Sequence, residues 1–126
     1  MQQLTNYDDI MTELLDFFIR RKRECIRLGI KDIIVDPGFG FAKTIVQNFL
    51  ILKQLKMLNM LGLPIMVGLS RKSTVYKTLN IKPEESLNGT TVMHTLALEQ
   101  GAQILRVHDV KEAVETIRLW TSYAKA

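Results

Sequence analysis

Three short polar runs in this sequence carry the side chains best suited to bind a small molecule. They read DPGFGFAKT at residues 36–44, GLSRKS at 68–73 and RVHD at 106–109. The first offers a carboxylate next to two glycines, the second two cations next to two hydroxyls, and the third an arginine two residues before a histidine. Such groups accept N–H donors and bind anions, so the runs are candidates for one binding site.

In the first run, Asp36 is an acceptor-only group that could bind the paired N–H donors of a heterocycle, and the glycines allow a tight bend. A carboxylate that only closes a turn or caps a helix would give the same sequence. The run lacks the third glycine of the dinucleotide-binding fingerprint. The residues alone leave the binding and capping interpretations open.

The second run opens a short predicted helix. Its cations and hydroxyls, from Ser70 to Ser73, could hold an anion and donate hydrogen bonds to a ring carbonyl. The run is not a Walker A motif. A solvated basic turn is the alternative.

The third run combines Arg106 and His108, which share one face of a strand because residues two apart point the same way. A planar cation beside an imidazole at a strand end is suited to a diphosphate. The alternative is a structural pair of Arg106 with an aspartate. We expect Asp109 to cap the helix that follows, with Glu112 completing a capping box.

Each polar run lies at the carboxyl end of a predicted strand. Apolar, β-branched runs predict strands at 31–35, 64–68 and 103–107, and helical spacing fills the segments around them. Helices are expected from Asn6 to Gly29, at 44–61 and 74–79, from Ser86 or Asn88 to Gly101, and after Asp109. The last of these helices is expected to bury Ala113, Val114, Ile117 and Trp120.

This alternation predicts an α/β fold of parallel βα repeats. Three strands make a narrow sheet, so the pattern by itself leaves open an open α/β sheet or a piece of a (β/α)₈ barrel. Ligand sites in both lie at the carboxyl ends of the strands, where the polar runs stand.

The composition excludes several classes of protein. The chain has 126 residues, a net charge of +4 and one cysteine, which rules out a disulfide framework and a multi-cysteine zinc site. It shows no secretory signal and no apolar run of about 20 residues, so a cytoplasmic protein without a membrane segment is expected. The basic run at 20–23 has no interleaved aromatic residues and does not indicate nucleic-acid binding. Ordinary packing is expected for His94.

The runs at 36–44, 70–73, 88–90 and 106–109 resemble, in order and spacing, the motifs of the dihydropteroate synthase family of pterin-binding barrel enzymes. Ala42 stands where that family commonly has glycine. The resemblance implies a TIM barrel, of which residues 1–126 would be one incomplete domain: the C-terminal half, with about the last three strands and their helices.

The resemblance also implies roles for individual residues. Asp36 would bind the amino-pyrimidine edge of the pterin and Lys72 would contact its ring, while Arg106 and His108 would grip the diphosphate. Arg106 would also lie against the pterin. These four would be the catalytic residues. The full set implied to contact substrate is Asp36, Phe41, Gly68, Ser70, Lys72, Arg106 and His108, with Ser70 and Phe41 at the pocket for p-aminobenzoate or a sulfonamide.

The reaction implied is the condensation of 6-hydroxymethyl-7,8-dihydropterin diphosphate with p-aminobenzoate, which gives 7,8-dihydropteroate and diphosphate in folate biosynthesis. Mg²⁺ would take its ligand from the missing N-terminal half, and a homodimer is expected. The 126 residues alone are expected to be inactive, because half of the site would be absent. Nucleic acid and membranes are not expected partners.

Two other functions are compatible with parts of the pattern. A pterin-binding methyltransferase domain would share the barrel, although the runs at 70–73 and 106–108 argue against it. A non-catalytic half-barrel that self-associates to cover its open sheet edges is the second alternative.

Overall fold

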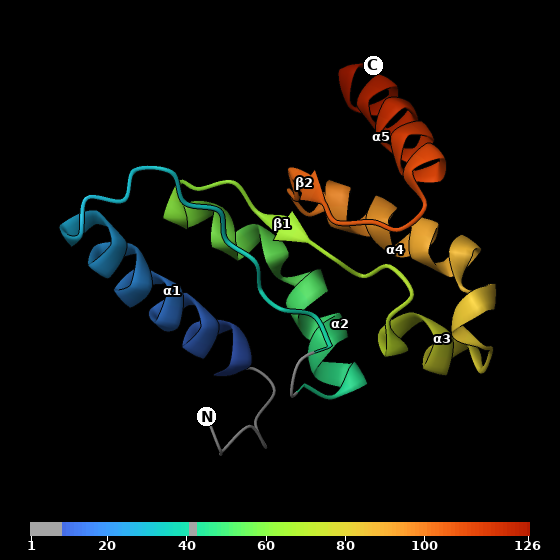
Figure 1. The fold of residues 1–126 in the computed structure, drawn as a ribbon, viewed down its shortest axis with the longest axis horizontal. Coiled ribbons are helices and arrows are strands. Elements are labelled where there is room, and N and C mark those ends of the chain that lie inside the picture. The colour runs from blue at the N-terminus through green and yellow to red at the C-terminus, as the bar shows by residue number, and fades with distance from the viewer. Residues whose placement is uncertain (1–8, 41–42) are drawn as a thin grey trace.

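The computed structural model of the chain describes residues 9–40 and 43–126, and Figure 1 shows their helices together with short central strands. Figure 1 also shows α1 and α5 at opposite ends of the molecule. The elements are α1 (Asp9–Arg27), α2 (Ile45–Lys53), the 3-10 helix η1 (Leu55–Leu61), β1 (Met66–Val67), α3 (Ser73–Leu79), the 3-10 helix η2 (Pro83–Glu85), α4 (Leu87–Glu99), β2 (Ile104–Leu105) and α5 (Val110–Lys125).

The three predicted strands run parallel, side by side, but each is shorter than predicted. β1 pairs with β2, and a single parallel bridge joins Val35 to Ile65, just before β1. Among the described residues, the segment at Val35 and β2 lie at the two edges of this small sheet, with β1 between them. An edge segment has a neighbour on one side only, so few ladder hydrogen bonds hold it.

The pairing brings the carboxyl ends of the strands to one edge of the sheet. The Met66 N–H donates to the Val35 carbonyl at 2.8 Å, and the Arg106 N–H donates to the Val67 carbonyl at 2.9 Å. The first two polar runs begin directly after Val35 and Val67, and the third begins with Arg106 itself. The parallel register therefore positions all three runs at the edge where the sequence predicts a site.

The predicted helix 44–61 is divided in two. It begins as expected, with a capping box between Thr44 and Gln47, but the α-helix ends at Lys53 and η1 follows. The buried leucines of η1 stand three residues apart, which matches the three residues per turn of a 3-10 helix. These buried residues are Leu55, Leu58 and Leu61.

The helices pack in chain order, α1 against α2 and η1, then α2 against α3, α3 against α4, and α4 against α5. The prediction for α5 was partly wrong. Ala113 and Thr116 are buried and Trp120 is half-buried, but Val114 is 48% and Ile117 is 40% exposed. The buried face of α5 is therefore turned toward Thr116 and away from Val114. Within 9–40 and 43–126, no helix is both long and apolar enough to cross a membrane.

We expect Gly89→Ala to destabilise the protein, although alanine is ordinarily more favourable than glycine inside a helix. A Cβ at position 89 would lie 2.5 Å from Val75 Cγ1 and 2.9 Å from Leu79 Cδ1, so α3 and α4 would have to move apart. Overpacking of this kind costs about 1–3 kcal/mol, and urea denaturation would measure it as a lower free energy of unfolding.

The control measurement repeats Gly89→Ala in a Val75→Ala protein, which lacks the methyl groups nearest the added Cβ. Gly89→Ala should cost less stability in Val75→Ala than in the wild type, because the two sites are in contact. Equal costs in both backgrounds, or a more stable Gly89→Ala protein, would contradict this packing explanation.

Candidate functional site

Direct contacts join the three polar runs at the carboxyl edge of the sheet. The Lys72 ammonium group donates to the Phe39 carbonyl at 2.7 Å, and its side chain passes Gly40, where an added Cβ would lie 3.4 Å from Lys72 Cδ. The Ser70 hydroxyl and His108 Nδ1 are hydrogen bonded at 2.7 Å. The second run therefore touches both the first and the third.

Arg106 lies beside Gly68 at the ends of β2 and β1. A Cβ added at Gly68 would lie 3.4 Å from Arg106 Cβ and 3.8 Å from Cδ, so the glycine leaves room for the arginine side chain. In the described ranges Arg106 forms no ion pair with a carboxylate; the two ion pairs there join Arg21 to Glu24 and Arg71 to Asp109. The structural Arg–Asp pair considered for Arg106 does not form among these residues.

Asp36 closes a turn and still presents an exposed carboxylate. Its Oδ1 accepts the Gly38 N–H at 2.8 Å, which is the capping role considered as the alternative. The residue is exposed, and a carboxylate has further lone pairs for other donors. Closing the turn therefore does not exclude binding a ligand.

The loop that follows Asp36 is held by two further contacts. Lys43 Nζ donates to the Gly38 carbonyl at 3.0 Å, and Asn48 Oδ1 on α2 accepts the Gly40 N–H at 3.0 Å. Asn48 is almost completely buried. Sequence reasoning missed this residue; the only signal was a polar side chain near the start of a mostly apolar helix.

The site carries an excess of positive charge. Burial lowers the pKa of Lys72, an effect that nearby Asp36 opposes and that Arg106 and Lys43 reinforce. Burial also lowers the pKa of Lys43, and Asp36 again opposes the shift. Lys72 thus lies near two other cations, Lys43 and Arg106, and a bound anion would relieve their repulsion.

The predicted capping box at α5 was wrong. Asp109 stands at the N-cap position but its side chain makes no capping hydrogen bond. Its Oδ1 instead accepts from Arg71 Nη2 at 3.0 Å. The Asp109 carboxylate therefore accepts a charge-assisted hydrogen bond from Arg71 in another loop, and it accepts none from the backbone N–H groups at the start of its own helix.

Two buried polar residues of α4 contact the second run, and sequence analysis assigned neither a role there. His94 Nε2 accepts the Leu69 N–H at 3.4 Å, and Thr90 Oγ1 accepts the Arg71 N–H at 3.2 Å. The expectation of ordinary packing for His94 omitted this hydrogen bond. Thr90 and His94 are four residues apart, which puts both side chains on one face of the helix. This spacing was the signal in the sequence that could have indicated a shared role.

Two predictions are not tested by the described residues. Phe41 lies outside them. Within the described part of the chain, no group of three or more histidine, cysteine or acidic side chains is arranged to hold a metal ion.

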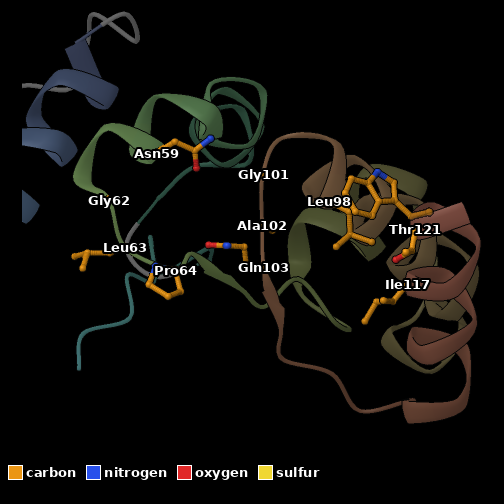
Figure 2. A pocket seen from close by; sticks show the side chains of 11 residues that line it. Asn59, Gly62, Leu63, Pro64, Leu98, Gly101, Ala102, Gln103, Ile117 and Thr121 are labelled. Atoms are coloured by element: carbon orange, nitrogen blue, oxygen red, sulfur yellow. The ribbon is translucent and has the colours of Figure 1, made fainter. Parts of the chain in front are cut away.

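A hollow of about 740 Å³ lies away from this site, at the amino ends of the strands (Figure 2). Pro64 and Gln103, which precede the paired residues of β1 and β2, line it together with Leu98, Ile117 and Trp120. Figure 2 shows Pro64 and Gln103 on the strand side and Ile117 facing them from α5. The hollow shares no residue with the polar runs.

Comparison with known proteins supplies independent information. Residues 1–108 match the family described as pterin binding enzyme. The dihydropteroate synthase of Escherichia coli is 41% identical over 121 residues, which cover 94% of this chain and 43% of that protein. The chain thus spans less than half the length of this curated relative.

Solved structures agree closely in fold. A Yersinia pestis dihydropteroate synthase in complex with a sulfonamide drug has a TM-score of 0.92 at 40% identity, covering 99% of this chain and 46% of that one. The Xanthomonas albilineans enzyme in complex with 7,8-dihydropteroate has a TM-score of 0.91 at 33% identity. The match covers 100% of this chain and 51% of that one. The fold is accordingly part of a TIM barrel, the second of the two architectures that the sequence pattern left open.

We expect the protein to lose stability through His94 as the pH falls. Burial lowers the pKa of His94 from 6.5 to about 4, so between these values the unfolded chain binds a proton that the folded chain excludes. This contribution to stability is complete above pH 6.5 and is lost as the pH approaches 4. Denaturation curves across the interval would measure it.

His94→Gln is the matched variant, because it removes the titrating group and keeps a side chain that accepts hydrogen bonds. Its free energy of unfolding should fall less steeply with decreasing pH over the same interval. The carboxylates that also titrate there are common to both proteins, so identical slopes would show that His94 is not the source.

Proposed function

Because the chain belongs to the family of pterin binding enzymes, we propose that it forms the diphosphate- and pterin-binding part of a dihydropteroate synthase. The whole enzyme would condense 6-hydroxymethyl-7,8-dihydropterin diphosphate with p-aminobenzoate. The observation that carries this proposal is the joining of three separate polar runs at one strand edge through Lys72, Ser70 and His108.

The pterin would bind beside Asp36 and Lys72. An exposed carboxylate matches the amino-pyrimidine edge of a pterin, which presents paired N–H donors, and an ammonium group matches the ring carbonyl. Lys72 lies close enough to Asp36 for their charges to interact. One flat heterocycle could therefore contact both side chains.

The diphosphate would bind at Arg106 and His108. Arg106 is an exposed guanidinium group without a carboxylate partner among the described residues, and guanidinium groups bind phosphate oxygens in a bidentate manner. The hydrogen bond between the Ser70 hydroxyl and Nδ1 orients His108. Gly68 keeps the space beside Arg106 open, and Ser70 and Phe41 would border the p-aminobenzoate or sulfonamide pocket.

In the proposed reaction the C–O bond between the pterin methylene and the diphosphate breaks, and the diphosphate leaves with the electron pair. The electron-rich pterin delocalises the positive charge on the methylene carbon. The arylamine nitrogen then bonds to that carbon and loses a proton. Arg106 and His108 would stabilise the negative charge that develops on the leaving group, so no residue needs to act as a nucleophile.

Other features of the proposal concern the whole enzyme. Mg²⁺ would take its protein ligand from residues that this chain does not span, and the roles given to Arg106 and His108 do not depend on it. A homodimer is supported by the exposed apolar side chains of α5, which include Val110, Leu119 and Tyr123. A cytoplasmic enzyme of folate biosynthesis that binds neither nucleic acid nor a membrane fits the single cysteine and the modest net charge.

A chimeric enzyme tests the proposal. The 121 matched residues of the Escherichia coli synthase are replaced by the corresponding part of this chain, and formation of 7,8-dihydropteroate is measured. We expect turnover by the chimera and none by the 126 residues alone. A folded chimera that binds neither the pterin diphosphate nor p-aminobenzoate would contradict the proposed function.

In the same chimera, Arg106→Ala should lower kcat/KM about 100-fold, because a charge-assisted contact worth about 2–3 kcal/mol is lost as the diphosphate departs. Arg27→Ala removes an exposed arginine at the end of α1 and is the control, with no expected change. Unchanged turnover of Arg106→Ala would refute the diphosphate assignment.

A further inference from the structure

The turn that presents Ser70 and Lys72 has a backbone conformation that its sequence does not favour. The Lys72 N–H donates to the Leu69 carbonyl at 3.2 Å, which closes a four-residue turn with Arg71 in third position. Arg71 has φ +56°. Positive φ at this position ordinarily calls for glycine or asparagine, so contacts from elsewhere must hold the turn.

Those contacts come mainly from one face of α4. Thr90 and His94, one helical turn apart, accept the N–H groups of Arg71 and Leu69 respectively. They are 4% and 2% exposed, so neither acceptor is readily replaced by water. The Arg71 side chain is held separately by Asp109, at 3.0 Å.

The held turn sets the direction of two side chains of the site. Ser70, between the two anchored amides, reaches His108 Nδ1 at 2.7 Å, and Lys72, directly after them, reaches the Phe39 carbonyl at 2.7 Å. Burial keeps His94 neutral at neutral pH by lowering its pKa to about 4. A neutral imidazole protonated at Nδ1 has an unprotonated Nε2, which can accept the Leu69 N–H.

We propose that Thr90 and His94 are positioning residues, which hold the Leu69–Lys72 turn through its backbone and thereby orient Ser70, Lys72 and His108 toward the bound substrate. The identity of the substrate in this inference rests on the proposed function. The hydrogen bonds of Thr90 and His94 to the turn do not depend on it. Neither residue is expected to touch the substrate, since both are buried in α4 behind the turn.

The first experiment measures amide hydrogen exchange and the ¹⁵N signals of the His108 ring by NMR in the 126-residue chain. Thr90→Val deletes the acceptor and keeps the side-chain shape. We expect exchange at the Arg71 amide to accelerate about tenfold or more, the His108 signals to shift, and the Met93 and Ala97 amides of α4 to stay protected. His94→Leu should have the same effect at Leu69 and is the second variant if Thr90→Val fails to fold.

Two controls separate positioning from general stability. Thr90→Ser keeps the hydroxyl and should restore wild-type exchange at Arg71. Thr95→Val removes a hydroxyl that bonds only to the Thr91 carbonyl of its own helix, and it should change neither Arg71 exchange nor the His108 signals. If Thr90→Val and Thr95→Val give the same exchange at Arg71, the proposal is wrong.

The second experiment places the same substitutions in the chimeric enzyme and measures its affinity for 6-hydroxymethyl-7,8-dihydropterin diphosphate by calorimetry. We expect Thr90→Val and His94→Leu to bind about tenfold more weakly, which corresponds to about 1.4 kcal/mol, and Thr90→Ser to bind as the wild type does. A loosened turn with unchanged affinity would overturn the positioning role. If the chimera without these substitutions binds no ligand while the turn responds as expected, the proposed function fails and the geometric inference stands.

Discussion

The parallel pairing of three short strand segments is the constraint on which the rest of this structure depends. The Val35 carbonyl accepts from Met66 and the Val67 carbonyl accepts from Arg106, so the chain leaves the sheet three times at the same edge. A slip of one residue in either pairing would turn the side chains of that segment to the opposite face. Lys72 would then no longer lie close to both Asp36 and Arg106.

Helices do more than cover this sheet, because two of them hold the loops of the site. Asn48 on α2 accepts a backbone N–H of the first loop, and Thr90 and His94 on α4 accept two from the second. All three side chains are buried, so their hydrogen bonds face little competition from water. A site made of exposed and half-buried charged side chains thus rests on a buried layer of neutral polar ones.

The same arrangement leaves part of the apolar surface uncovered. Ile34 is 54% exposed beside a buried Val35, and α5 exposes Val114 and Leu119. A chain that corresponds to 43% of the length of the Escherichia coli synthase contains only some of the strands that would enclose a barrel. In the proposed enzyme the remaining strands would cover Ile34, and a second subunit would cover the exposed side of α5.

The amino-acid sequence determined the features that depend on local pattern. Alternation of apolar strands with helices gave the class of fold and the order of elements, and the polar runs after each strand gave the edge at which Asp36, Lys72 and Arg106 meet. The motifs also indicated the family, to which residues 1–108 belong. These features follow from backbone geometry and from residue types at fixed spacing, both of which can be read along the chain.

Only the tertiary structure decided which polar groups became partners. Asp109 had the sequence of a helix cap, yet it binds Arg71, which lies 38 residues away, and Ser70 meets His108 over the same separation. The division of the helix after Lys53 and the exposure of Val114 were equally hidden. Each of these outcomes depends on which elements pack together and on which of two competing hydrogen bonds is stronger. The residue pattern within a single segment does not contain that information.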